Sequence, residues 1–403
     1  MSKMLKSRVM ALNPRFNYIP QGDRHFLARE TPKYKFNVIG SGIMGQEHVR
    51  VTMMEGRATI KGVYDPNPGS IAGAQAEYKQ FDPEGALQVH ESVEAACLDP
   101  DVDGLIIATP NFTHVGLIKE AIKSGKHIML EKPIATNLQD AYTIYEIGEE
   151  YKGVFQVGLQ YRYKPTYRET INMIMGQKSA VGDIKTITMT EHRIPFLDKV
   201  DQWNKFSEYS GDTLVEKCCH YFDLMNLFAG ARPVRVYASG SQAVNFVGYE
   251  YNGKTSDIMD NAMVVVDYEN GVRANFNLCM FAPMFYEELV LCGDSGYLKT
   301  WEKEDFLAQS STGTGLELFR GDDQTSLRMT PSYPATIQHS GHLGATFMEH
   351  IDFVNNIDGI ATPTATALEG LWSIIVASAA QESIKQGQVV QINDYLQANN
   401  INI

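Results

Sequence analysis

A glycine-rich turn near the start of the chain constrains its fold more than any other feature. An apolar, β-rich run over residues 34–39 leads into the turn at residues 40–45, and a stretch of helical character follows to about Glu55. A second apolar run over residues 59–64 ends at Asp65, about twenty residues after the last glycine of the turn. This order of strand, Gly-x-Gly-x-x-Gly turn, helix, strand and acidic residue is typical of a dinucleotide-binding βαβ unit.

Each glycine of the turn has a separate role. Gly40 permits the tight turn, Gly42 lets the backbone approach a pyrophosphate, and Gly45 lets the helix pack closely on the strand. The Asp65 carboxylate can accept hydrogen bonds from both ribose hydroxyls and would repel a 2′-phosphate, and residues 66–68 contain no arginine, so NAD is predicted rather than NADP. The cofactor contacts predicted here are Gly40, Gly42, Ile43, Met44, Gly45 and Asp65.

The alternation of strands and helices continues to about residue 165. Buried-strand runs over residues 102–109, 127–130 and 154–159 alternate with helical stretches, which predicts a mostly parallel sheet. Ligands of such sheets lie beyond the carboxyl ends of the strands. We therefore expect one crevice to be lined by Asp65 together with Thr109, Pro110, Asn111, Glu131, Lys132, Pro133, Gln160 and Arg162.

The second half of the chain has a different texture. Its β-rich runs are joined by turn signals, which predicts an antiparallel sheet, and helical patterns over residues 213–228, 344–356 and 367–385 would cover it or pack on the first domain. The predicted fold is thus α/β, with an N-terminal arm (1–33), a Rossmann domain (34–165) and a substrate-binding and oligomerisation domain (166–403) with a mostly antiparallel open sheet. The strand-like runs are 184–192, 234–239, 261–267, 272–278 and 287–292.

Composition excludes several classes of protein. With 35 Lys and Arg against 48 Asp and Glu, the net charge of −13 argues against general binding of nucleic acid or anionic lipid. No run approaches the roughly 18 apolar residues of a membrane span. The five cysteines are an odd number without Cys-x-x-Cys spacing, which fits a reducing cytoplasm. The basic arm has no signal-peptide pattern and is expected to be either disordered or packed on a neighbouring subunit.

Four motifs, in this order, resemble the glucose-fructose oxidoreductase / inositol dehydrogenase / MocA family. They are Gly40-x-Gly42-x-x-Gly45, Ala108-Thr109-Pro110-Asn111-x-x-His114, Glu131-Lys132-Pro133 and Glu216-x-x-x-His220-x-x-Asp223. The resemblance extends from Tyr34 to the C-terminus. It implies a Rossmann domain followed by an α/β domain whose open sheet buries oligomer contacts, in a homo-oligomer such as a dimer or tetramer. It also implies hydride transfer between a sugar or cyclitol carbon and the nicotinamide, with further cofactor contacts at Thr109, Pro110, Asn111, His114, Glu131, Lys132 and Gln160.

By the same resemblance, Lys132 is a catalytic or substrate-orienting residue and His220 the proton acceptor. The chemistry is consistent with both roles. Oxidation of a secondary alcohol removes a hydroxyl proton as hydride leaves the carbon, which needs a group titrating near neutrality, while an ammonium can stabilise the developing alkoxide. The spacing of Glu216, His220 and Asp223 predicts that they share one helix face. Glu216 stands where the family commonly has Asp, which puts its direct contact with substrate in question.

Each candidate also has a purely structural interpretation. Lys132 could be a surface lysine, His220 a satisfied core histidine, and Glu216 one half of an i, i+4 pair. A metal site at Cys218-Cys219-His220 is disfavoured because adjacent helical residues point about 100° apart. Arg162 could bind a substrate oxygen or bridge the domains, and Trp203 could stack on a sugar or fill a core. The predicted substrate contacts are Lys132, Arg162, His192, Trp203, Glu216 and His220.

Three classes of function follow from these residues. The first is an NAD-dependent dehydrogenase of a sugar, glycoside or inositol. The second is an NAD-dependent glycosidase that uses transient oxidation and elimination; a tightly held cofactor would favour it, or an oxidoreductase that recycles its cofactor between two sugars. The third is a non-catalytic regulator that binds a dinucleotide and a sugar, because a fold does not determine a function. Retention of both Lys132 and His220 argues against the third class.

Overall fold

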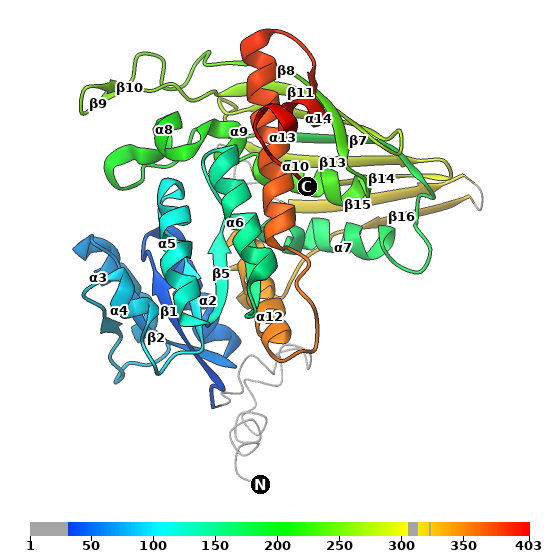
Figure 1. Cartoon of the computed structure of the whole chain (residues 1–403). Coiled ribbons are helices and arrows are strands. Elements are labelled where there is room, and N and C mark those ends of the chain that lie inside the picture. The colour runs from blue at the N-terminus through cyan, green and yellow to red at the C-terminus, as the bar shows by residue number, and fades with distance from the viewer. Residues whose placement is uncertain (1–30, 305–312, 322–323) are drawn as a thin grey trace.

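Two large sheets, one parallel and one mostly antiparallel, organise the computed structural model of the chain (Figure 1). The structure describes residues 31–304, 313–321 and 324–403. The expected arm at residues 1–33 lies almost wholly outside these ranges. A short two-stranded ribbon of β9 (Glu250–Tyr251) and β10 (Lys254–Thr255) completes the described strands.

The first sheet has six parallel strands in the order β3-β2-β1-β4-β5-β6, which is the doubly wound Rossmann order. The predicted parallel sheet is therefore confirmed. Its strands β1, β4, β5 and β6 are almost wholly buried, as expected for a sheet that carries helices on both faces. The strands are β1 (Tyr34–Ile39), β2 (Ala58–Tyr64), β3 (Gln88–Val89), β4 (Gly104–Ile107), β5 (His127–Glu131) and β6 (Phe155–Gly158).

Local signals set the ends of the helices around this sheet. The Asn67 side chain caps one helix by accepting from the backbone N–H groups of Gly69 and Ser70, with Pro68 at its first position. Gly56, at φ 85°, ends the helix that follows the glycine-rich turn. The helices are α2 (Ile43–Glu55), α3 (Pro68–Lys79), α4 (Val93–Cys97), α5 (His114–Ala121) and α6 (Leu138–Glu150).

The second sheet has nine strands in the order β16-β15-β14-β13-β7-β12-β11-β8-β17. Only the β7–β12 pair is parallel, so the predicted, mostly antiparallel sheet is confirmed. Four strands that the sequence patterns did not indicate, β14 to β17, extend it. The strands are β7 (Ile184–His192), β8 (Pro233–Ser241), β11 (Asn261–Tyr268), β12 (Arg273–Cys279), β13 (Phe285–Gly293), β14 (Gly296–Glu304), β15 (Gly313–Arg320), β16 (Thr325–Met329) and β17 (Val390–Gln391).

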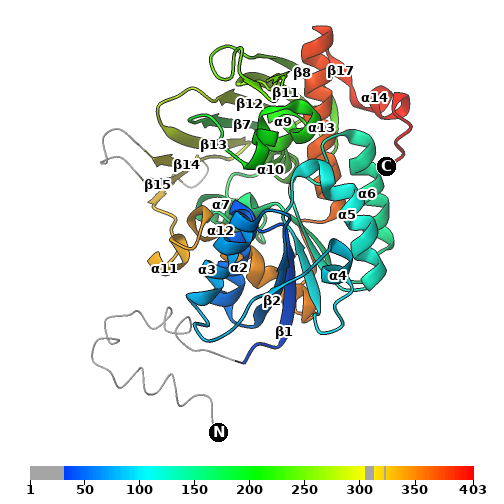
Figure 2. The same ribbon diagram turned by 90° about the vertical axis from the view of Figure 1, so that its left-hand side faces the viewer.

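Two C-terminal helices join the domains. In Figures 1 and 2, α12 (Ala345–Ile357) lies beside α2, and α13 (Ala367–Gln386) runs from the first domain to the second sheet. Phe353 and Val354 of α12 close one face of the parallel sheet, while buried residues of α13 belong to a core shared by both domains. No described helix is long and apolar enough to cross a bilayer. The remaining helices are α7 (Pro165–Ile174), α8 (Ser207–Ser210), α9 (Asp212–Glu216), α10 (Cys219–Ala229), α11 (Ala335–Gln338) and α14 (Ile392–Ala398).

Candidate active site

The glycine-rich turn lies at the carboxyl edge of the parallel sheet and has the space that a dinucleotide needs. Gly40 has a φ of 88°, and a Cβ atom on Gly45 would lie 2.0 Å from the Gly40 carbonyl oxygen. A Cβ on Gly42 would meet no atom within 4 Å. Two of the glycines are thus required by the fold itself, whereas Gly42, at the N-terminus of α2, leaves space that a phosphate group could fill.

Asp65 ends β2 on the same side and faces the glycine-rich turn. Its Oδ2 accepts from the backbone N–H of Ser41 (2.7 Å), and its Oδ1 accepts from that of Asn67 (2.8 Å). The buried Ser41 hydroxyl has no hydrogen-bond partner among the described residues. An acidic side chain, an open backbone cradle and an unsatisfied hydroxyl at one helix N-terminus fit the ribose and pyrophosphate of NAD.

Replacing Asp65 by asparagine should relax the choice of cofactor. The amide keeps an acceptor for the turn but removes the charge that repels a 2′-phosphate, so the ratio of kcat/KM with NAD to that with NADP should fall at least about tenfold. Steady-state rates with both cofactors measure the effect. An unchanged ratio would show that Asp65 does not contact the ribose of the cofactor.

The other predicted cofactor contacts follow strands β4, β5 and β6 at the same edge. Asn111 is buried and donates to the Ser210 carbonyl across the domain boundary (3.0 Å). Gln160 is buried as well, and its Oε1 has no partner among the described residues. Ile43 is 55% exposed at the start of α2, where a cofactor could cover it. Met44 lies next to Ile43 in the first turn of α2. The loop after β4 contains Thr109 and Pro110.

His114 differs from its predicted role. Both of its ring nitrogens face backbone carbonyl oxygens, of Pro133 (2.9 Å) and Thr109 (3.1 Å), and its side chain is fully buried. The imidazole therefore connects the loop after β4 to the loop after β5 and presents no free nitrogen to a cofactor. Both carboxylate oxygens of Glu131 also have partners. One contacts His48 Nε2 (2.9 Å), and the other accepts from the Lys132 backbone N–H (3.0 Å).

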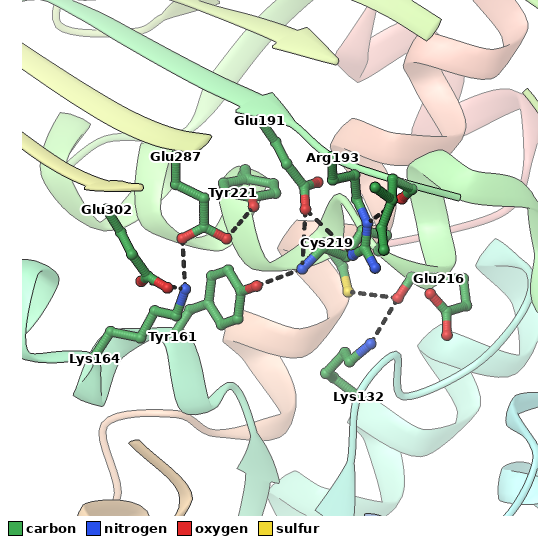
Figure 3. Close-up of polar contacts among 12 residues, drawn as sticks. Lys132, Tyr161, Lys164, Glu191, Arg193, Glu216, Cys219, Tyr221, Glu287 and Glu302 are labelled. Carbon is green, nitrogen blue, oxygen red and sulfur yellow. Dashed lines mark hydrogen bonds and ion pairs between the residues drawn. The ribbon is translucent and has the colours of Figure 1, made fainter. Parts of the chain in front are cut away.

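An unexpected break in a helix brings the two domains together. The predicted single helix over residues 213–228 is wrong, because α9 ends at Glu216 and α10 begins at Cys219. The Glu216 carbonyl, left without a backbone partner by this break, accepts from Lys132 Nζ (2.8 Å). The peptide bond between Lys132 and the next residue, Pro133, is cis. The lysine of the first domain is thus fixed on the helix end of the second, as Figure 3 shows.

Charges around this contact set the protonation of both partners. Burial lowers the pKa of Lys132 and is the largest single effect, but Glu216, Cys219 and Glu131 together raise it by more, so its net direction is upward. Burial raises the pKa of Glu216, yet Lys132 and Lys199 lower it well below its ordinary value; Lys199 Nζ lies 3.0 Å from Glu216 Oε1. Lys132 is therefore held as an ammonium and Glu216 as a carboxylate.

His220 occupies the first turn of α10 and is buried against an aromatic ring. It stacks on Tyr161 with ring centroids 4.0 Å apart and an interplanar angle of 8°. Its Nδ1 is buried and has no hydrogen-bond partner among the described residues. Burial lowers the pKa of His220 well below 6.5, and the cations Lys132 and Lys217 lower it further. The imidazole is thus neutral at pH 7, the form that can take up a proton.

A row of three glutamates crosses the second sheet next to His220. Glu191, Glu287 and Glu302 pair across neighbouring strands β7, β13 and β14 and point to the same buried face (Figure 3). Like charges directly opposite one another destabilise a sheet, so this row needs cations. Lys164 Nζ bridges Glu287 (2.6 Å) and Glu302 (2.8 Å), and Lys217 Nζ lies 3.3 Å from Glu191.

The break after Glu216 also directs Lys217 into this row. Besides Glu191, its ammonium contacts the Tyr161 hydroxyl, and its pKa is lowered by burial and by Arg193 despite Glu191. The sequence analysis did not identify Arg193, Lys199 or the glutamate row. Strand alternation could have indicated Glu191, since it shares a face with the apolar Ile187 and Met189.

The other three predicted substrate contacts have different surroundings. His192 is one residue beyond Glu191, so it points to the opposite face of the sheet, where its Nε2 lies 3.3 Å from Asn277 Nδ2. Arg162 is buried and paired with Asp223 (Nε to Oδ2, 2.7 Å), which corresponds to the domain-bridging interpretation. Because Asp223 is committed to this pair, it does not orient His220. Trp203 lies at the edge of the site, with Lys199 Nζ 4.3 Å from its ring centroid.

The doubly wound sheet, the glycine cradle and the lysine and histidine held at one domain boundary define a two-domain, dinucleotide-dependent oxidoreductase. Family models bear this out: residues 34–159 match the NAD-binding Rossmann fold of the GFO_IDH_MocA oxidoreductase family, and residues 178–392 match its C-terminal alpha/beta domain. The chain belongs to this family, and NAD is its cofactor.

Three similar proteins share less than a quarter of their aligned residues with this chain. Inositol 2-dehydrogenase of Rhizobium meliloti is 23% identical over 89% of this chain and 99% of its own length. The scyllo-inositol 2-dehydrogenase (NAD(+)) of Bacillus subtilis is 24% identical over 88% of this chain and 95% of its own. The solved structure of a levoglucosan dehydrogenase with NADH and levoglucosan covers 89% of this chain and 99% of its own, with a TM-score of 0.74 at 19% identity.

Proposed function

We propose that the chain is an NAD-dependent dehydrogenase that oxidises a secondary alcohol of a sugar, glycoside or inositol. The observation that carries the proposal is the convergence of Lys132, from the end of β5, and His220, from the start of α10, at the broken helix after Glu216. Similarity to inositol dehydrogenases and to a levoglucosan dehydrogenase supports this substrate class.

In this proposal His220 and Lys132 have different roles at the substrate hydroxyl. Bound NAD would supply the hydride acceptor, held by the glycine cradle and Asp65. The neutral His220 imidazole, with its unpartnered Nδ1, accepts the hydroxyl proton of the substrate. The Lys132 ammonium, held by the Glu216 carbonyl, donates a hydrogen bond to the same oxygen as negative charge develops on it. Glu216 is a positioning residue in this scheme, since its carboxylate pairs with Lys199.

The proposed roles predict the pH dependence of the oxidation. Because the pKa of His220 is lowered well below 6.5, the base is already neutral at pH 7, and kcat/KM should not fall between pH 7 and 6.5. At lower pH, protonation of the imidazole removes the base and kcat/KM should fall. Rates between pH 5 and 8 give the midpoint. A midpoint at or above 6.5 would contradict the environment described for His220.

The proposed function is tested by NADH absorbance with the purified protein, NAD and a panel of inositols, hexoses, uronic acids and glycosides. A sustained rise with one class of alcohol supports the dehydrogenase. A flat trace with a cleaved glycoside among the products would replace it with a redox-assisted glycosidase. A flat trace without product across the panel would contradict both.

A further inference from the structure

Three cations around His220 are more exposed than the carboxylates they face, whereas Lys164 and Lys217 are buried. The side chains of Glu191, Glu216 and Glu287 are 0%, 6% and 1% exposed. Those of Lys199 and Arg193 are 31% and 17% exposed, and Lys132 is also partly exposed. A molecule entering from solvent therefore meets positive groups first, although the chain as a whole carries a net charge of −13.

With every group ionised, the cations and carboxylates of this cluster balance at five each. Glu131 is one of the carboxylates, because it accepts from the Lys132 backbone N–H (3.0 Å) and raises the pKa of Lys132. The cations are Lys132, Lys164, Arg193, Lys199 and Lys217, and the carboxylates are Glu131, Glu191, Glu216, Glu287 and Glu302.

Two of the exposed cations take no part in the proton chemistry. Arg193 makes a long ion pair with Glu191 (Nη1 to Oε1, 3.4 Å), donates from Nε to the Ile194 carbonyl (3.1 Å) and lies 5.3 Å from the Phe196 ring centroid. Lys199 Nζ pairs with the Glu216 carboxylate (3.0 Å) and lies over Trp203, and the same carboxylate raises the pKa of Arg193. A guanidinium and an ammonium on the same side of a site match the two oxygens of a carboxylate.

We propose that the substrate carries a carboxylate that Arg193 and Lys199 bind, so that the alcohol oxidised belongs to a sugar acid. Because the charges of the cluster balance, it accommodates a monoanion more easily than a phosphate ester, which carries close to two negative charges at pH 7. This inference rests on the proposed function and specifies its substrate class. It departs from the inositols and the levoglucosan that the three similar proteins reported above are named for.

Matched substrates test the proposal. Several hexoses are compared with their uronic acids, their uronamides and their 6-phosphates, using kcat/KM from NADH formation. The uronate should exceed both the hexose and the uronamide by about 10- to 100-fold, as expected for charge-assisted hydrogen bonds. Arg193→Gln and Lys199→Met should each reduce that preference at least about tenfold, and Arg193→Lys should retain part of it.

Control variants lie at the other end of the same sheet, in the first residues of β12 and β7. The side chains of Arg273 and Lys185 are 70% and 59% exposed, and Arg273→Gln and Lys185→Met should leave the preference unchanged. Equal or better kcat/KM with neutral sugars would overturn the inference and leave the dehydrogenase intact. A preference for the 6-phosphates over the uronates would overturn the carboxylate assignment.

Calorimetry separates failure of the inference from failure of the proposed function. If no substrate yields NADH, titration of uronates into the protein with NAD still reports the anion site. Binding that weakens at least tenfold in Arg193→Gln would support the inference while the dehydrogenase fails, and absence of binding would overturn the inference as well.

Discussion

Replacing Lys132 by methionine or His220 by glutamine should each lower kcat by about 10² to 10⁴-fold. Removal of a general base or of the group that stabilises a developing alkoxide typically costs this much. The effects of the two changes should not multiply in the double variant, because both act on one oxygen of the substrate. Steady-state kinetics, with NAD affinity measured separately by fluorescence titration, test the prediction.

Affinity for NAD should change less than about threefold in both variants, since the cradle that holds the cofactor is formed by other residues. Lys254→Met is a suitable control, because Lys254 is exposed and pairs with Glu208 away from the site. If both single variants kept a double-digit percentage of the normal rate, Lys132 and His220 would not be the acid–base pair.

Substituting the glycines of the turn should separate cofactor binding from folding. Gly42 has a φ of −66°, which alanine adopts freely, and its Cβ would enter open space. Gly42→Ala should therefore leave the thermal midpoint within about 2 °C but weaken NAD binding roughly 100-fold, or about 2.7 kcal/mol, by occupying the approach of the pyrophosphate. Gly45→Ala should instead lower the midpoint by roughly 5–10 °C, because its Cβ would overlap the Gly40 carbonyl.

Gly116 in α5 provides the matched control. A Cβ there also meets no atom within 4 Å, and both ring nitrogens of the neighbouring His114 face backbone carbonyl oxygens. Gly116→Ala should keep NAD binding and stabilise the helix by up to about 1 kcal/mol. Normal NAD affinity in Gly42→Ala would show that the cofactor does not bind against this turn. The two readouts are calorimetric titration with NAD and thermal unfolding.

Much of the fold could be predicted because its signals are local. The glycine turn followed by Asp65 indicates a βαβ unit within a window of about thirty residues, and the strand ends beyond it then meet at one edge by topology alone. Alternation of buried and exposed residues identified β7, β11 and β13 in the same way. The strands at the far edge, such as β16, are mostly exposed and carry no such pattern.

The parts of the site that escaped prediction depend on contacts between distant segments. The helix break after Glu216 is stabilised by Lys132 from the other domain, and helical spacing alone gives no sign of it. Arg162 is fixed by Asp223, 61 residues away. His192 was expected in the site, but it points away from it. Its neighbour Glu191 points into the site, because consecutive residues of a strand point to opposite faces of the sheet.

The central claim is tested most directly by following deuterium. A compound that the protein converts, detected by NADH formation or by product analysis, is prepared with deuterium on the carbon that bears the reacting hydroxyl, and the cofactor and product are examined by NMR after turnover in ordinary water. A dehydrogenase should transfer the deuterium to one face of nicotinamide C4 and leave the neighbouring carbons unexchanged. Deuterium that returns to the product, with a solvent proton on the adjacent carbon, would contradict simple dehydrogenation and indicate transient oxidation with elimination.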